Sequence, residues 1–129
     1  MHSDSVPQVS QWTRDLYRAI DARDVHACLE YLTDDASFRF GNAEPMIGRS
    51  AIAQGFGAFY GAVHGIHHHI THEWNDGEAR IIEADVSYTR KDHHVVTVPA
   101  ITVYRMAGSR VSQGQIFVDL APVFGPVPA

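Results

Sequence analysis

Three short polar segments in the second half of the chain constrain its fold more than any other feature. Asn75-Asp76-Gly77, Lys91-Asp92-His93 and Ala107-Gly108-Ser109 interrupt long apolar stretches. Short loops rich in Asn, Asp and Gly are typical of the turns between neighbouring antiparallel strands. The strands that these turns predict cover residues 66–74, 79–90, 94–106 and 110–120, and Pro122 should end the last one. Pro99, inside the third, predicts an edge position, a bulge or a bend.

The first half of the chain has apolar residues at helical spacing. Pro7 predicts a helix start after Asp4 or Ser5. Asp24 should cap a second helix, and a third should begin near Ser50. A short strand over residues 36–40 separates the second helix from the third. Helices followed by an antiparallel meander predict an α+β fold, in which a cone-shaped curved sheet wraps around three N-terminal helices and encloses a pocket.

Composition limits the function classes. The 129 residues suit a single domain spanning 1–129. A net charge of -5 argues against a nucleic acid partner, which usually requires a basic patch. No apolar run approaches the roughly 20 residues that cross a bilayer, and the first residues lack the basic and apolar regions of a signal peptide. Cys28 is the single cysteine, which suits a cytoplasmic protein without internal disulfides.

Four of the nine histidines lie within the predicted strand 66–74, namely His67, His68, His69 and His72. Strand side chains alternate between two faces, so these histidines cannot act as one group. Alternation places His68 and His72 with Ile70 and Trp74, on the face that we expect to line the pocket. His67 and His69 then share the other face with Thr71 and Glu73. This second pair could bind zinc, but a catalytic zinc site needs three protein ligands and no third ligand is obvious. We therefore expect no metal.

Three segments resemble a known superfamily. They are Asp21-Ala22-Arg23-Asp24 between the first helices, Tyr31-Leu32-Thr33-Asp34-Asp35-Ala36 before the first strand, and the closing Gly114-Gln115-Ile116-Phe117-Val118-Asp119-Leu120-Ala121-Pro122. Over about residues 8–124 the chain resembles the nuclear transport factor 2-like superfamily. That group includes ketosteroid isomerases, SnoaL-like polyketide cyclases, limonene epoxide hydrolases and scytalone dehydratases. The resemblance implies the cone fold and commonly a dimer, but one fold of this kind hosts many reactions.

The resemblance carries over few catalytic residues. The ketosteroid isomerase base falls at Phe40, its protonated aspartate near Thr102, and its tyrosine near Leu16, one residue from Tyr17. The epoxide hydrolase set of two aspartates and an arginine falls at the positions of three apolar residues, which are Val86, Ala84 and Ile116. The scytalone dehydratase pattern matches in part, with Asp21 at its aspartate and His68 at one of its histidines.

These observations name four candidate catalytic residues, with Tyr104 as an alternative to one of them. His68 would be a general acid-base, with Asp21 as its orienting partner. Asp119 is an alternative base, and Tyr88 or Tyr104 could donate a hydrogen bond to an oxyanion. Each has a structural alternative: a core histidine bonded to a carbonyl for His68, a helix cap for Asp21, a contact to backbone near Pro122 for Asp119, and packing for the tyrosines.

Two functional hypotheses follow. The first is a cofactor-independent enzyme that isomerises, cyclises or dehydrates an apolar or aromatic carbonyl compound. The alternative is a non-catalytic protein that binds a small hydrophobic molecule, or an epoxide hydrolase-like hydrolase. In each case the expected pocket residues are Phe38, Phe40, Phe59, Tyr60, His72, Trp74, Thr102 and Tyr104, together with Tyr88. A homodimer through the outer sheet face, over His67, His69, Ser87 and Thr89, is a further expectation.

Overall fold

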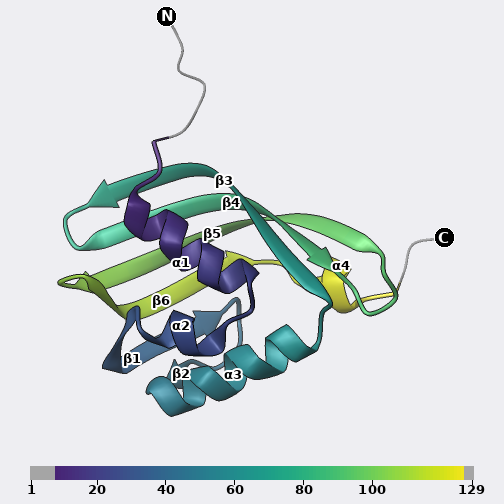
Figure 1. The fold of residues 1–129 in the computed structure, drawn as a ribbon, viewed down its shortest axis with the longest axis horizontal. Coiled ribbons are helices and arrows are strands. Elements are labelled where there is room, and N and C mark those ends of the chain that lie inside the picture. The colour runs from purple at the N-terminus through teal and green to yellow at the C-terminus, as the bar shows by residue number, and fades with distance from the viewer. Residues whose placement is uncertain (1–7, 127–129) are drawn as a thin grey trace, which may run out of the picture.

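One curved sheet lies against three helices in the computed structural model, which describes residues 8–126 (Figure 1). Within these residues there are four helices and six strands. In chain order they are α1 (Gln11–Asp21), α2 (Val25–Leu29), β1 (Leu32–Phe40), β2 (Met46–Ile47), α3 (Arg49–Gly61), β3 (Gly65–Asp76), β4 (Ala79–Thr89), β5 (Val95–Ala107), β6 (Arg110–Val118) and α4 (Ala121–Phe124). The expected α+β fold is confirmed. None of the helices within residues 8–126 is long and apolar enough to cross a membrane.

Helix α1 begins later than the sequence predicted. Pro7 lies outside the described residues, and the first helical residue is Gln11, capped by the Ser10 hydroxyl, which accepts from the Thr13 N–H. The Ser10 N–H and hydroxyl both donate to the Glu73 carboxylate on β3. This contact fixes the start of α1, because Glu73 holds the capping residue Ser10 in place. The predicted cap of α2 is confirmed, since Asp24 accepts from the Ala27 N–H.

The sheet has the strand order β2-β1-β6-β5-β4-β3. Strands β3 to β6 form the predicted antiparallel meander. The sequence did not predict that β1 would pair in parallel with β6, with Phe38 opposite Gly114. Pro99 of β5 pairs with Asp85 of β4, whereas the β6 pairing starts only at Ala100. Of the three alternatives for Pro99, the structure therefore shows a local edge position.

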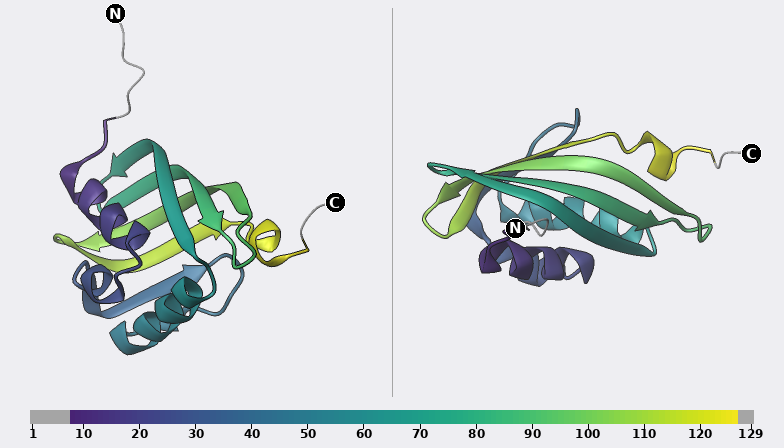
Figure 2. Two further views of the ribbon diagram at one scale, coloured as in Figure 1. Left: turned by 45° about the vertical axis from the view of Figure 1, so that its right-hand side comes forward. Right: turned by 90° about the horizontal axis from the view of Figure 1, so that it is seen from above.

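The sheet bends over α1, α2 and α3, and its concave face holds most of the core (Figure 2). Ile82 and Val86 of β4 and Val111 of β6 are almost fully buried on this face, packed against the residues of α1 and α3. The last strand ends at Val118, so Pro122 lies inside the short helix α4 and does not directly terminate the strand. The helices thus close one side of a space whose other wall is the concave sheet face.

A β-bulge in β3 corrects the predicted faces of two residues. Ile70 pairs with Ala84, but His72 pairs with Glu83, so Thr71 is an extra residue on β3. An extra residue reverses the alternation beyond it. His72 and Trp74 consequently lie on the convex face, where Trp74 is 46% exposed. The prediction that they line the pocket was wrong.

Candidate functional site

A cavity lies between the concave sheet face and helices α1 and α3. Its wall is mostly apolar, and eight of its residues are aromatic. The lining residues are Tyr17, Ile20, Phe38, Phe40, Phe56, Phe59, Tyr60, Ile66, His68, Ile82, Ala84, Val86, Tyr88, Ala100, Thr102, Tyr104 and Ile116. The centre of a water molecule can reach about 50 Å³ of this space, enough for a few waters at roughly 10–15 Å³ each. A molecule that fits without moving the walls must be small.

Asp21 and His68 form a tightly bonded pair at this cavity. Asp21 is the last residue of α1, and His68 lies on β3 before the bulge. The Asp21 Oδ1 atom lies 2.6 Å from His68 Nδ1, and Oδ2 accepts from the His68 backbone N–H at 3.0 Å. The second contact is available because β3 is an edge strand with free backbone donors. The carboxylate therefore fixes both the strand and the ring of His68.

This pairing determines which ring nitrogen of His68 is free. An ionised carboxylate can only accept hydrogen bonds, so Nδ1 carries a hydrogen toward Asp21. The lone pair of the neutral ring is then on Nε2, which has no hydrogen-bond partner within residues 8–126. The His68 side chain is only 14% exposed. His67 is different: its side chain is 75% exposed and its Nδ1 lies 3.8 Å from Asp21 Oδ2, beyond hydrogen-bond range.

A pair of tyrosine hydroxyls lies close to His68. The hydroxyl oxygens of Tyr17 and Tyr104 are 2.8 Å apart, and the Tyr17 ring meets the His68 ring edge-on at 4.8 Å between centroids. Burial raises the pKa of Tyr17 to about 12, although the hydrogen bond from Tyr104 opposes the shift. Burial also raises the pKa of Tyr104 well above its ordinary value. Both phenols are therefore neutral at physiological pH. One hydrogen is used within the pair, and the other can donate to a further acceptor.

Tyr88, on β4, contributes a third hydroxyl to the wall. Its side chain is buried, with the Phe59 ring edge-on at 5.7 Å. Burial, followed by the negative charge of Asp21, raises the pKa of Tyr88 to about 12. Tyr88 thus stays protonated and can donate a hydrogen bond inside the cavity.

The structure places most of the predicted pocket residues in the cavity wall. Phe38, Phe40, Phe59, Tyr60 and Thr102 all line it, as do the tyrosines described above. Their roles in substrate binding stay predictions.

Asp119 lies away from the cavity wall. Its side chain is exposed, and it accepts a hydrogen bond from the Ala121 N–H at 3.0 Å at the start of α4. This is the backbone contact that the sequence analysis gave as the alternative to catalysis. The carboxylate is thereby occupied on the surface, so the structure favours this contact over the role of Asp119 as an alternative base.

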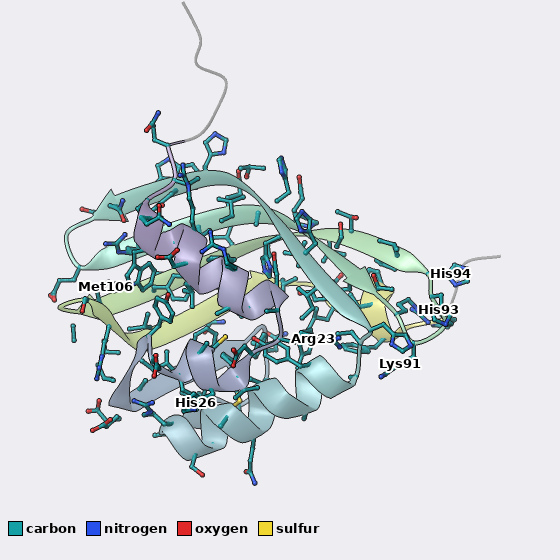
Figure 3. All side chains as sticks on the ribbon, in the orientation of Figure 1. Arg23, His26, Lys91, His93, His94 and Met106 are labelled. Carbon is teal, nitrogen blue, oxygen red and sulfur yellow. The ribbon has the colours of Figure 1, made fainter. Side chains whose placement is uncertain are left out.

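The outward histidines do not form a metal site. Within residues 8–126, no three His, Cys, Asp or Glu side chains are grouped so that they could hold a metal ion. His93 and His94 lie in the turn between β4 and β5, at the end of the sheet where β3 begins (Figure 3), and the His93 ring stacks on His64. His72 instead binds Glu83 at 2.9 Å and stacks on Trp74.

Sequence reasoning missed Tyr17 as a cavity residue. The apolar residues Trp12, Leu16 and Ile20 have helical spacing, and the resemblance placed the tyrosine of ketosteroid isomerase near Leu16, one residue from Tyr17. A second row with helical spacing, Thr13, Tyr17 and Ile20, runs beside that stripe, and Thr13 and Tyr17 are buried. The polar residues in that row were the signal that could have identified Tyr17.

Comparison with solved structures supports the fold. A hypothetical protein with a ketosteroid isomerase-like fold from Catenulispora acidiphila, crystallised with trimethylamine, is 19% identical with a TM-score of 0.82 over 90% of this chain and 91% of its own. A protein provisionally named a SnoaL-like polyketide cyclase from Jannaschia is 15% identical with a TM-score of 0.74 over 97% and 99%. An epoxide hydrolase-like protein from M. tuberculosis is 18% identical with a TM-score of 0.73 over 88% and 84%.

These identities establish similarity of fold and not of reaction. No curated protein sequence matches the chain. The family model for the SnoaL-like domain does match, over residues 13–114. That range spans most of α1 through the middle of β6, and so includes the Asp21–His68 pair and every cavity-lining residue except Ile116. The chain belongs to the SnoaL-like domain family.

Proposed function

We propose that this protein is a cofactor-independent enzyme that removes a proton next to the carbonyl of a small, neutral, apolar molecule. The observation that carries the proposal is the Asp21–His68 pair at the wall of an aromatic cavity. His68 Nε2 would take the proton, and Asp21 would hold the ring and stabilise the imidazolium that forms. The electron pair of the broken C–H bond would become an enolate.

The tyrosine hydroxyls supply the second requirement of such a reaction. The free hydrogen of the Tyr17–Tyr104 pair can bond the carbonyl oxygen and follow it as negative charge develops. Tyr17 lies against the ring of His68, so the oxygen and the departing proton would be held on neighbouring groups. If the proton returned to another carbon, the product would be an isomer. If the enolate expelled a hydroxyl group as water, the reaction would be a dehydration. If the enolate attacked a second carbonyl of the same molecule, the reaction would be a cyclisation.

The charge of the cavity disfavours an anionic substrate. None of the described residues that line it is Arg or Lys. The negative charge of Asp21 raises the pKa of Tyr17, Tyr60 and Tyr88, each shift being due first to burial. An environment that opposes the phenolate also opposes an anionic ligand.

Exchange of α-protons in deuterated water tests this proposal. Acetone, cyclohexanone and methyl propyl ketone are incubated with the protein, and loss of the α-proton signal is followed by NMR. His68→Ala should lower the exchange rate at least about 100-fold. His69→Ala is the matched control, because that histidine is adjacent on the same strand but on the exposed convex face.

Asp21→Asn tests the contribution of the Asp21 carboxylate while the imidazole of His68 is kept. The amide keeps the shape but cannot stabilise the imidazolium, so exchange should fall although His68 remains. Circular dichroism and urea unfolding establish that each variant is folded. If His68→Ala lowers only the stability and ketone exchange continues, His68 is a structural residue and the proposal is wrong.

A second candidate function is binding without catalysis. Eight aromatic side chains surround the cavity, and aromatic rings attract organic ammonium ions. The similar Catenulispora acidiphila protein was crystallised with trimethylamine. NMR titration with trimethylammonium chloride would show this function by saturable shifts of cavity residues, without any ketone exchange. Epoxide hydrolysis is less well supported, because Val86, Ala84 and Ile116 line the cavity at the positions of that catalytic set.

We also propose that a second copy of the chain covers the convex sheet face. Phe117 of β6 pairs with Ile101 of β5, and these residues are 57% and 37% exposed. The same row continues through Glu83 to His72, with Trp74 beyond it. Adjacent exposed apolar residues are typical of interaction surfaces. Light scattering at micromolar concentration should give the mass of a dimer, and Phe117→Asp should give a monomer.

A further inference from the structure

We infer that Tyr88 is a second polar anchor in the cavity, so that the ligand carries two oxygens on either side of the carbon that faces His68. This inference rests on the proposed function and names the class of carbonyl compound that the site takes. Such a molecule is a hydroxycarbonyl or a dicarbonyl compound. The first oxygen bonds the Tyr17–Tyr104 pair, and the second accepts from Tyr88.

The Tyr88 hydroxyl has no protein hydrogen-bond partner among the described residues. The side chain is 6% exposed, and within residues 8–126 no hydrogen bond to its oxygen is present. The other buried tyrosines of the cavity differ, since Tyr17 bonds Tyr104 and Tyr60 contacts the Cys28 thiol. Buried hydroxyls are nearly always bonded, because an unpaired one loses its bonds to water without compensation. A ligand atom is the natural partner for a hydroxyl that faces a cavity.

The sheet register places Tyr88 on one side of His68. His68 pairs with Val86, and Tyr88 lies two residues further along β4. Such diagonal neighbours are about 7–8 Å apart, within reach of aromatic side chains. Tyr104 pairs with Arg80, six residues before Val86 on the same strand, so the Tyr17–Tyr104 pair approaches His68 from the opposite direction.

The chemistry of the three groups agrees with a ligand of this kind. His68 Nε2 accepts a proton, while Tyr88 and the Tyr17–Tyr104 pair donate hydrogen bonds from phenols that stay neutral. In a dicarbonyl compound, the two carbonyl groups that flank the central carbon also make its hydrogens more acidic, which suits removal by an imidazole. A ligand with a single oxygen would leave the Tyr88 hydroxyl unpaired.

A stability comparison tests the premise without any ligand. Tyr104→Phe removes half of a buried hydroxyl pair and should lower the urea midpoint of unfolding. Tyr88→Phe removes an unpaired hydroxyl, so it should leave the midpoint unchanged or raise it. If Tyr88→Phe lowers the midpoint as much as Tyr104→Phe, the hydroxyl is already bonded in the free protein and the inference fails.

Two ketones of equal carbon chain length test the ligand class. Acetylacetone has an oxygen on either side of its central carbon, and methyl propyl ketone has one oxygen. Affinities are measured from amide chemical shifts in NMR titrations. The wild-type protein should prefer acetylacetone by about threefold to tenfold, the value of one hydrogen bond. Tyr88→Phe should abolish this preference and leave the affinity for methyl propyl ketone unchanged. Tyr31→Phe, a tyrosine outside this cavity, should keep the preference.

The outcomes separate this inference from the proposed function. Equal affinities in the wild-type protein, or a preference that survives Tyr88→Phe, would overturn the role of Tyr88 while leaving the His68 reaction intact. Absence of binding by both ketones would refute the carbonyl substrate itself, and the inference would fall with it. Loss of ketone exchange in His68→Ala bears on the catalytic proposal alone.

Discussion

Gly114→Ala should destabilise the protein, because the glycine makes room for an aromatic ring. Gly114 of β6 lies opposite Phe38 of β1. A Cβ atom at this position would lie 2.3, 2.6 and 2.8 Å from three atoms of the Phe38 ring, whereas ordinary contacts begin at 3.4 Å. The ring cannot retreat freely, since Phe56 packs edge-on at 5.2 Å and Tyr104 lies at 6.3 Å. Overpacking of this kind costs about 1–3 kcal/mol.

Urea unfolding measures this cost, and a second glycine provides the matched control. Gly57 is on α3, its φ is not positive, and an added Cβ would meet nothing within 4 Å. Gly57→Ala should therefore stabilise the protein by about 0.5–1 kcal/mol, the usual difference between the two residues in a helix. An unfolding free energy for Gly114→Ala equal to or above that of the wild type would refute this explanation of the close approach.

The same substitution should weaken ligand binding. Phe38 lines the cavity, and a ring displaced away from β6 moves toward Phe56 on the opposite wall. The reachable space is only about 50 Å³, so a displacement comparable to a carbon radius removes a large share of it. Affinity for methyl propyl ketone should fall in Gly114→Ala and not in Gly57→Ala.

Three further substitutions test individual contacts. Burial raises the pKa of Glu73, but hydrogen bonds led by the Ser10 N–H outweigh it and leave the pKa below its usual value. The ionised Glu73 therefore stabilises the folded protein above about pH 4.3, and this stabilisation is lost as the pH falls through the lower folded-state pKa. In urea unfolding, the free energy of unfolding of Glu73→Gln should fall less at acid pH than that of the wild type. Arg23 donates to the Val63 carbonyl at 2.8 Å, and Arg23→Ala should cost about 1 kcal/mol; an unchanged urea midpoint would mean that water replaces the bond. Asp119→Ala should leave ketone exchange unchanged, and a large loss would restore the carboxylate as a catalytic candidate.

Local signals predicted the parts of the fold that depend on neighbouring residues. The turns that define the meander and the Asp24 cap are set within a few residues, and the sequence predicted both. The start of α1 depends on Glu73, which is 63 residues from Ser10, so the sequence analysis placed it too early. The parallel pairing of β1 with β6 likewise joins distant segments and has no local signature.

Arg23 shows how a turn that looked like simple capping holds the site together. The residue has a positive φ of 56°, uncommon for a side chain of this size. Its guanidinium donates to the carbonyls of Tyr60 and Val63 at the end of α3, where α3 itself has no basic residue in the last turn (Figure 3). The turn after Asp21 is thereby tied to the segment that leads into β3 and His68. The pair that the resemblance suggested from sequence is thus supported by a contact that the sequence did not reveal.

The β-bulge explains why one histidine was assigned to the correct face and another was not. The alternation of side chains along a strand assigns them to the correct sheet face only as far as the next β-bulge, because one extra residue exchanges the two faces. His68 precedes Thr71 and faces the cavity, whereas His72 follows it and faces outward. Glu73 then takes the inward position, and its carboxylate reaches the Ser10 N–H and hydroxyl. Without the extra residue, Glu73 would point outward and the start of α1 would lose this partner. The bulge that misled the face assignment is therefore the feature that lets β3 hold α1, and with it Asp21, against His68.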